Sequence, residues 1–403
     1  MVAKSMRLLL LLSTLALLSA CGGAPAAQPT MPPAPPTAPA AKATPAPTSG
    51  GVTSGSATAE SAREGPAVEQ LEGTERPVVG GTGGVTTTEA MTTTEAITGS
   101  VTYVLVPKNL GNPYFDTANI GAQEAAKELG VTVLYQGPAT ADATKQIELL
   151  NSLIAQKVAG LAISADDADA LVPVGKAAID AGIPVVTWDS AIAPGGRQVH
   201  INQAVSADIA AVQIKMASEL AGGAGKIAIL SATSTAPNQN EWIALMKEEL
   251  KKPEYAKLEL VDTVYGDDED TKSYTEAQSL IKKYPDLKVI IAPTTVGIAA
   301  AARAVQDAKL VGKVFVTGLG TPNQMREYVK SGAAPQFALW NPGDLGYLAI
   351  QTLHAIQMGT IKGLPGDKFT AGRLGSYTID KDGVVLLGPP TIFYQVNIDT
   401  FNF

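Results

Sequence analysis

The sequence predicts an α/β fold with parallel sheets that are covered by helices on both faces. Short runs of β-branched and aliphatic residues alternate with segments of helical periodicity from residue 101 onward, and this alternation is typical of strand–helix–strand units. The alternating region, 101–403, is long enough for two sheets, since single cores seldom grow beyond about 250–300 residues. Hydrophobic residues make up 45% of the chain, which supplies material for both cores.

The first half of this region has clear local signals. The run 101–106 is rich in β-branched residues, as expected for a buried strand. A helix over 113–129 begins with proline and ends before Gly130, a favourable C-cap residue. Asp166 or Asp167 is expected to cap a helix that continues to Gly182. The other predicted strands are 131–135, 160–164 and 184–187, and the other predicted helix is 143–156.

The second half continues the same alternation. Ligands of open parallel sheets bind beyond the carboxyl ends of the strands, so the segments that follow the strands are where a site is expected. These segments carry uncharged polar groups, a few charges and aromatic residues, and they are poor in catalytic residue types. The predicted strands are 226–230, 258–264, 289–292 and 314–317, and the predicted helices are 206–221, 238–250, 272–284, 297–308, 322–331 and 344–358.

The N-terminus has the composition of an export signal. Lys4 and Arg7 precede an apolar run over 8–18 that is too short for a spanning helix. Small residues follow and lead to Cys21, the only cysteine of the chain. This segment resembles a bacterial lipobox, which implies a signal peptide at 1–20 and lipid attachment to Cys21. A plain signal peptide with an unrelated cysteine is the alternative.

Residues 21–100 are expected to form a tether. Alanine, proline, threonine, glycine and serine dominate them, and large aliphatic or aromatic residues are rare. Such a segment cannot bury enough apolar surface to offset the entropy lost on ordering. We therefore expect a lipidated, disordered spacer that holds the folded domain 101–403 away from the membrane.

Charge and composition exclude several classes of function. A formal net charge of −8 and a pI near 5.0 argue against nucleic-acid binding, which requires clustered lysine and arginine. One cysteine leaves no intrachain disulfide and no cysteine-rich zinc site. His200 and His354 are the only histidines and are most simply structural or exposed. We expect no metal, no cofactor and no nucleic-acid partner.

Two short motifs resemble functional loops only superficially. Residues 222–226, Gly-Gly-Ala-Gly-Lys, lack the spacing of a phosphate loop and precede a strand instead of following one. The acidic run 267–270 lacks the glycine and glutamate that a calcium-binding EF-hand loop needs, and is expected to be a solvated turn before a helix. No nucleophile elbow or zinc-protease motif occurs, so the chain is not expected to be an enzyme.

Several segments resemble a known family. Residues 112–115 (Asn-Pro-Tyr-Phe), 121–126 and 183–190 (Ile-Pro-Val-Val-Thr-Trp-Asp-Ser) are similar to periplasmic sugar-binding proteins of the ribose-binding type. The likeness covers essentially all of 101–403. It implies two Rossmann-like lobes with parallel sheets, joined by a three-crossover hinge and closing around one small ligand. The implied N-lobe spans about 101–200 and 341–360, and the C-lobe about 201–340 and 361–403.

Within this superfamily the chain is most similar to the rhamnose-binding and autoinducer-2-binding branch of ABC transporter receptors. Residues 338–347 and 388–391 look most like rhamnose-binding proteins. Autoinducer-2 receptors use a lysine and an aspartate that match Lys108 and Asp189. They also use an Asp-Gln pair that falls on Asn238 and Gln239, and a Pro-x-Ala that falls on Pro293 and Thr295. Asn238 and Thr295 therefore depart from their pattern. Ribose binders have an aspartate where Leu319 stands here.

The resemblance assigns roles to the strand-end residues. Asp189 would accept hydrogen bonds from neighbouring sugar hydroxyls, and Lys108 would donate to the ligand and balance that carboxylate. Tyr114, Phe115 and Trp340 would cover the apolar face of the ring. Helix capping is the alternative for Asn238, Gln239 and Thr295, and core packing is the simpler role for Trp188 and Trp242. The expected ligand-binding residues are Lys108, Asn112, Tyr114, Phe115, Asp189, Asn238, Gln239, Pro293, Thr295 and Trp340.

The expected function is a lipid-anchored extracytoplasmic receptor that binds a monosaccharide, rhamnose in the first place, for an ABC permease. An autoinducer-2 receptor for uptake of a quorum signal is the alternative. A sugar-modifying enzyme is a more remote one, which turnover of candidate sugars would reveal. We expect a monomer whose only attachment to the membrane is the lipid at Cys21.

Overall fold

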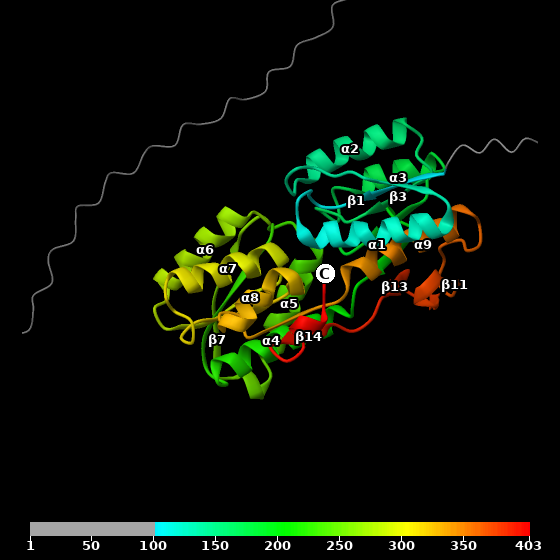
Figure 1. Cartoon of the computed structure of the whole chain (residues 1–403). Coiled ribbons are helices and arrows are strands. Elements are labelled where there is room, and N and C mark those ends of the chain that lie inside the picture. Colours follow the sequence, from blue (N-terminus) through cyan, green and yellow to red (C-terminus); the bar gives the residue numbers. More distant parts are fainter. Residues whose placement is uncertain (1–100) are drawn as a thin grey trace, which may run out of the picture. The chain divides into compact units, whose positions relative to one another are not determined.

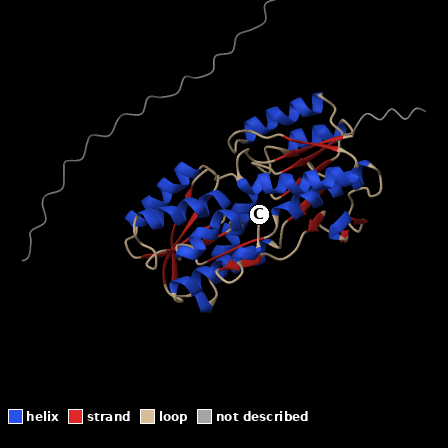
Figure 2. Ribbon diagram, viewed as in Figure 1, coloured by secondary structure: helices blue, strands red, loops and turns tan. Residues whose placement is uncertain are grey.

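A computed structural model describes residues 101–403 of the protein (Figure 1). The predicted signal peptide, Cys21 and the tether lie outside the described residues. Within 101–403 helices and strands alternate along the chain (Figure 2). The strands fall into two main parallel sheets, so the predicted two-lobed α/β fold is confirmed. No helix among the described residues combines the length and apolar character needed to cross a membrane.

The first lobe is built on a six-stranded parallel sheet in the order β13-β5-β4-β3-β1-β2. Alternate residues of its strands point to opposite faces. Tyr103 and Leu105 pack in one hydrophobic cluster with helices α1 and α9, whereas Val104 and Val106 pack in another with α2 and α3. The strands are β1 (Thr102–Val106), β2 (Thr132–Tyr135), β3 (Gly160–Ile163), β4 (Val185–Trp188), β5 (Val199–Asn202) and β13 (Val384–Leu386), and the helices are α1 (Pro113–Leu129), α2 (Ala143–Ala155), α3 (Val172–Asp180) and α9 (Pro342–Gln357).

The second lobe contains a four-stranded parallel sheet in the order β7-β6-β8-β9. A bridge between Leu319 and Ala338 places β10 beside β9, and β10 pairs antiparallel with β14. The elements are β6 (Gly225–Ser231), β7 (Leu258–Tyr265), β8 (Leu287–Ala292), β9 (Phe315–Gly318), β10 (Gln336–Leu339), β14 (Thr391–Tyr394), α4 (Ser206–Ala221), α5 (Pro237–Glu249), α6 (Asp270–Lys283), α7 (Thr295–Asp307) and α8 (Pro322–Ser331).

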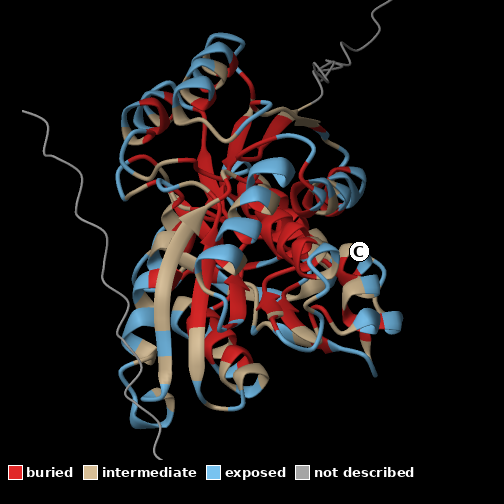
Figure 3. Cartoon of the chain, turned by 90° about the vertical axis from the view of Figure 1, so that its left-hand side faces the viewer, coloured by how far each residue is buried: buried red, intermediate tan, exposed pale blue. Residues whose placement is uncertain are grey.

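A few short elements complete the fold. A two-stranded antiparallel hairpin, β11 (Lys368–Thr370) with β12 (Ser376–Thr378), follows α9. Single turns of 3₁₀ helix occupy Pro253–Tyr255, Gly372–Leu374 and Ile398–Thr400. Buried residues gather along the strands and on the inner helix faces, and exposed residues lie on the outer faces (Figure 3).

The chain passes between the two sheets three times. It leaves the first sheet after β5, returns between β10 and α9, and leaves again between β13 and β14. The expected assignment of 361–403 to the second lobe is therefore wrong for β13. Its residues Val384, Val385 and Leu386 pair in parallel with β5, because they cover the otherwise open edge of the first sheet. β14 and the residues after it belong to the second lobe.

Most helix bounds agree with the sequence prediction, and the exceptions have local causes. The helices predicted at 113–129, 206–221 and 322–331 are observed with those bounds. Helix α3 starts at Val172, not near Asp167, because the Asp167 carboxylate accepts the amides of Asp169 and Ala170 and caps an isolated turn. The short strands β5, β10, β11, β12, β13 and β14 were not among the predicted strands.

Two glycines allow helices α1 and α9 to lie against each other. A Cβ atom on Gly121 would stand 1.8 Å from the carbonyl oxygen of Gly343, and one on Gly346 would stand 2.0 Å from that of Ala118. Only glycine fits such a close backbone approach. The close packing brings the start of α9, with the residues just before it, next to the start of α1, where several predicted site residues lie.

Candidate ligand-binding site

A cavity lies where both lobes meet. Its walls come from the carboxyl ends of strands and from the first turns of the helices that follow, as expected for open parallel sheets. All ten residues predicted to bind a ligand line this one cavity. Five more residues line it that were not predicted to, namely Trp242, Asp268, Thr294, Leu319 and Leu339.

The start of helix α1 presents three residues to the cavity. The Asn112 side chain caps this helix by accepting the amide of Tyr114 at 3.0 Å. The same Asn112 oxygen accepts the hydroxyl of Thr295 at 3.2 Å. Capping therefore fixes Asn112 and the helix start together, and it places Tyr114 and Phe115 on the cavity wall.

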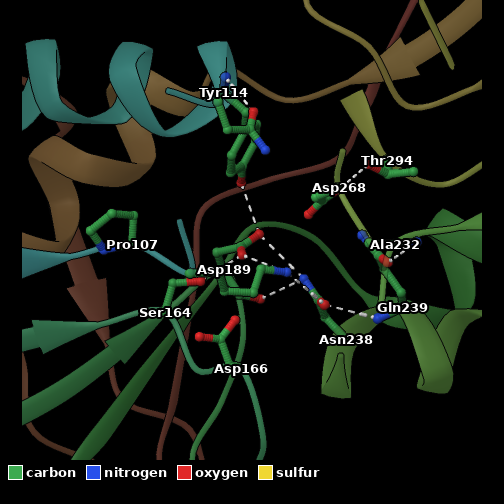
Figure 4. A network of polar contacts seen from close by, with 12 residues as sticks. Pro107, Tyr114, Ser164, Asp166, Asp189, Ala232, Asn238, Gln239, Asp268 and Thr294 are labelled. Carbon is green, nitrogen blue, oxygen red and sulfur yellow. Dashed lines mark hydrogen bonds and ion pairs between the residues drawn. The ribbon is translucent and has the colours of Figure 1, made fainter. Parts of the chain in front are cut away.

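Asp189 is the centre of a polar cluster (Figure 4). It follows β4 with a φ of 61°, a left-handed conformation that aspartate tolerates better than most residues. Its Oδ1 accepts the hydroxyl of Tyr114 at 3.1 Å and the amide of Asn238 at 3.3 Å. Its Oδ2 accepts the hydroxyl of Ser164 at 2.7 Å and lies 3.6 Å from the Lys108 Nζ.

Lys108 supplies the positive charge of this cluster. Its side chain is 4% exposed and follows β1. The Nζ atom also lies 3.5 Å from the Asn238 Oδ1 and 5.9 Å from the centre of the Phe115 ring. A buried ammonium needs such partners because its own desolvation is costly.

The predicted site residues of α5 and α7 lie inside these helices and not at their N-cap positions. Ala236 is the N-cap of α5 and Thr294 that of α7, and neither makes a capping side-chain bond. Gln239 accepts the hydroxyl of Ser231 and the amide of Ala232, each at 3.0 Å, and so ties α5 to the end of β6. Gln239 and Thr295 do not cap their helices, whereas the Asn238 Oδ1 accepts the Gln239 amide at 2.9 Å in the first turn of α5.

Aromatic rings form the apolar part of the wall. Tyr114 and Trp340 meet edge to face with ring centres 6.2 Å apart, and the Trp340 indole donates to the Tyr114 hydroxyl at 2.9 Å. Trp242 lies 6.1 Å from Trp340, belongs to the buried core as expected, and also lines the cavity. Trp188 packs edge to face on Phe115 and is fully buried away from the cavity.

Asp268 is the clearest residue that the sequence interpretation missed. It lies in the acidic run expected to be solvated, yet it is 8% exposed and lines the cavity. The Thr294 hydroxyl donates to its Oδ1, and burial raises the pKa of its carboxyl. Its place directly after the end of β7 is the signal that could have indicated it, since the other site residues also follow strand ends.

Two buried residues next to the site, Gln146 and Asp166, are joined by a hydrogen bond. Gln146 donates to the carbonyls of Pro107 and Ser164 at 3.1 and 2.8 Å, and it accepts the amide of Asp166 at 3.0 Å. The Gln146 side chain therefore joins the segments that follow β1 and β3. The Asp166 carboxylate is buried without a hydrogen-bond partner, and this burial raises its pKa to about 8, against the opposing effect of Lys108.

The two histidines lie outside this cavity. The His200 Nδ1 is 3.0 Å from the Thr187 hydroxyl, and burial lowers the His200 pKa to about 3. The His354 Nδ1 is 3.0 Å from the Tyr103 hydroxyl. Among residues 101–403 no group of three or more histidine, cysteine, aspartate or glutamate side chains is arranged to hold a metal ion.

Comparison with known proteins assigns the family. Residues 103–361 match the periplasmic binding protein domain. The chain belongs to the periplasmic binding protein family. This binding protein is 28% identical over 296 residues to the D-ribose/D-allose-binding protein of Pseudomonas aeruginosa, and the alignment covers 70% of this chain and 85% of the relative. It is 26% identical over 263 residues to the D-allose-binding periplasmic protein of Escherichia coli, covering 62% and 83%.

Solved structures share the fold of this binding protein over three quarters of its length. A sugar ABC transporter protein from Actinomyces odontolyticus is 45% identical with a TM-score of 0.61, covering 75% of this chain and 97% of that one. A solute-binding protein from Clostridium phytofermentas with bound L-rhamnose is 39% identical with a TM-score of 0.73, covering 75% and 98%. LsrB from Clostridium saccharobutylicum in complex with AI-2 is 27% identical with a TM-score of 0.72, covering 75% and 100%.

Proposed function

We propose that this binding protein is the lipid-anchored receptor of an ABC importer and that it binds L-rhamnose between its lobes. The observation that carries the proposal is the composition of the cavity. It combines charged and amide groups that can bond sugar hydroxyls with a wall of aromatic and aliphatic side chains. A monosaccharide presents both kinds of surface, and a 6-deoxy sugar such as rhamnose also has a methyl group that favours an apolar contact.

A ligand of this size must be closely enclosed to bind tightly. A monosaccharide has about a dozen heavy atoms, so micromolar affinity, about −8 kcal/mol, corresponds to roughly −0.7 kcal/mol per atom. Binding of that efficiency requires contacts on most sides of the ligand. The hydrogen bonds of Asn238 with Asp189 and of Thr295 with Asn112 join the lobes around the cavity and provide that enclosure.

Two wall positions favour rhamnose over other ligands of related receptors. Leu319 is a buried part of the cavity wall, where the ribose-binding proteins that the sequence resembles have an aspartate. Thr295 adds a hydroxyl inside the cavity, where the autoinducer-2 receptors have alanine. Support also comes from the relative that was solved with L-rhamnose, which is 39% identical to this chain.

Autoinducer-2 is the second candidate ligand. Lys108, Asp189, Gln239 and Pro293, which match the receptors of this signal, all line the cavity. LsrB in complex with AI-2 is a structural relative with a TM-score of 0.72. Uptake of this signal would use the same lobes, and a permease would again receive the ligand.

The proposed cellular setting follows from the sequence. Export by the signal peptide at 1–20 and lipidation of Cys21 would hold the protein, as a monomer, at the outer face of the cytoplasmic membrane or in the periplasm. The tether at 21–100 would let the binding domain reach its permease. The matched relatives are extracytoplasmic binding proteins, and one is named a periplasmic protein of Escherichia coli.

A thermal-shift screen tests the proposed function. The purified protein is heated with L-rhamnose, D-ribose, D-allose and autoinducer-2, with borate excluded. A ligand that binds the native state raises the melting temperature in a concentration-dependent way. We expect the largest rise with L-rhamnose. A rise with autoinducer-2 alone would replace rhamnose by the signal, and no rise with any of the four would refute the proposed ligand class.

A further inference from the structure

Each lobe places one buried carboxylate on the cavity wall. Asp189 comes from the first lobe and Asp268 from the second, and both line the same cavity. Both also have left-handed backbone conformations, with φ values of 61° and 54°. Such conformations are costly for residues other than glycine and persist where the surrounding structure imposes them, often at functional sites.

The two carboxylates differ in how many donors already surround them. An ionised carboxylate can accept about four hydrogen bonds. Asp189 is contacted by Tyr114, Ser164 and Asn238 and lies beside Lys108. Three of its roughly four acceptor sites are therefore already used by the protein, and the Lys108 Nζ lies 3.6 Å from Oδ2.

Asp268 retains free acceptor capacity. Its only hydrogen-bond donor among the described residues is the Thr294 hydroxyl, on Oδ1. In Figure 4 its side chain extends from the Thr294 side toward the Asp189 cluster. The residue is only 8% exposed, so its carboxylate has little contact with bulk water.

The backbone around Asp268 is built to keep this side chain in place. The amide of Gly266 donates to the Ser231 carbonyl at 2.8 Å, and the amide of Asp267 donates to the Ala232 carbonyl at 3.1 Å. A Cβ atom on Gly266 would stand 2.1 Å from the Ser273 hydroxyl, so only glycine allows the turn to pack on α6. The turn is thus fixed both to the end of β6 and to helix α6.

We propose that Asp268 is a specificity-determining ligand contact that accepts hydrogen bonds from sugar hydroxyls on the second-lobe side of the cavity. This inference rests on the proposed function. Asp189 then serves mainly to orient Tyr114, Asn238 and Lys108, which bond the remaining hydroxyls. The ligand must carry hydroxyl donors that reach Asp268.

The test is calorimetric titration of the full-length protein with L-rhamnose and its monodeoxy analogues. The variant Asp268→Asn keeps the shape of the side chain and replaces one acceptor oxygen by an amide nitrogen, which cannot accept a hydrogen bond. We expect its affinity for L-rhamnose to fall at least tenfold, about 1.4 kcal/mol. Asp267→Asn is the matched control, since Asp267 has the same backbone conformation but pairs with Lys272 outside the cavity. Its affinity should stay within about twofold.

The monodeoxy analogues show whether Asp268 contacts the sugar. One analogue should bind the unaltered protein much more weakly than L-rhamnose, and this difference should largely disappear in Asp268→Asn. Equal affinity of Asp268→Asn and the unaltered protein for L-rhamnose would overturn the inference while leaving the proposed function standing. Equal losses for every analogue in both proteins would also overturn it.

Two further results are informative. If Asp268→Asn does not fold, the analogue series on the unaltered protein still decides, because a contact with Asp268 requires one hydroxyl whose loss weakens binding. Autoinducer-2 is titrated in parallel and takes the place of rhamnose if it alone binds. Absence of binding by every ligand to the unaltered protein would overturn both the proposed function and this inference.

Discussion

The Nζ atom of Lys108 lies 3.6 Å from the Oδ2 atom of Asp189, and both side chains are buried. The two residues follow β1 and β4, which are separated in the sheet by β3. Ser164, at the end of β3, donates to the same Asp189 oxygen and fills the space between them. Three neighbouring strand ends thus form one polar centre on the first-lobe wall of the cavity.

Replacement of Asp189 by alanine should abolish ligand binding. It leaves the Lys108 charge buried without its partner and removes the group that orients Tyr114 and Asn238. Breaking a buried ion pair in this way costs about 3–5 kcal/mol of stability, which a domain of this size can tolerate with a lower melting temperature. Calorimetric titration together with urea unfolding measures both effects.

The control for this variant is Asp180→Ala. Asp180 forms an exposed ion pair with Lys176 on helix α3, at 2.7 Å, far from the cavity lining. Exposed pairs of this kind contribute at most about 1 kcal/mol, so affinity should not change and stability should change little. Asp189→Ala with unaltered affinity would remove Asp189 from the site.

Replacement of Thr295 by alanine should shift the preference between ligands. The change removes the hydroxyl that donates to Asn112 and restores the methyl group that the autoinducer-2 receptors have at this position. We expect L-rhamnose affinity to fall several-fold, since a neutral hydrogen bond contributes about 1 kcal/mol, and autoinducer-2 affinity to rise. Thr275→Ala, in the exposed face of α6, is the matched control. A fall in affinity for both ligands would argue against a role in specificity.

Asp166 should make stability depend on pH. Burial raises the pKa of this carboxyl from 3.8 to about 8. Between about pH 4 and pH 8 the folded protein therefore holds a proton that the unfolded chain has already released. The stability that this proton provides is present below pH 4 and is lost as the pH rises toward 8, at up to about 1.4 kcal/mol per pH unit.

The variant Asp166→Asn isolates this contribution. It cannot release a proton, so the unfolding free energy of the unaltered protein should fall relative to the variant as the pH rises from 4 to 8. Urea unfolding of both proteins at intervals across this range gives the difference. Parallel curves would show that Asp166 is ionised in the native state.

Replacement of Cys21 by serine should separate anchoring from binding. Without a thiol no lipid can be attached, so the exported protein should move from the membrane fraction to the soluble fraction. L-rhamnose affinity should not change, because the cavity residues that the structure describes lie between Lys108 and Trp340, far along the chain from Cys21. Retention of the serine variant in washed membranes would exclude lipidation of Cys21 as the anchor.

Much of the fold and site could be predicted because both depend on local patterns. The helix over Pro113–Leu129 has its proline and Asn112 cap at one end and Gly130 at the other, and it is observed with those bounds. The predicted site residues mostly follow strand ends, and parallel sheets bring such positions together.

The remaining features depend on contacts between distant segments. Strand β13 is three residues long, and its strand conformation depends on pairing with β5 at the edge of the first sheet. The burial of Asp268 results from a left-handed turn fixed on β6 and α6, which an acidic run does not indicate by itself. The donors around Asp189 come from three other segments, Tyr114, Ser164 and Asn238, so its acceptor capacity could be assessed only in three dimensions.

Calorimetric titration of the purified protein with L-rhamnose decides whether this sugar is the ligand. We expect one binding site per chain with micromolar affinity, about −8 kcal/mol, and no comparable binding of D-ribose. Saturable binding of autoinducer-2 or D-ribose in the absence of any L-rhamnose binding up to millimolar concentration would contradict this expectation.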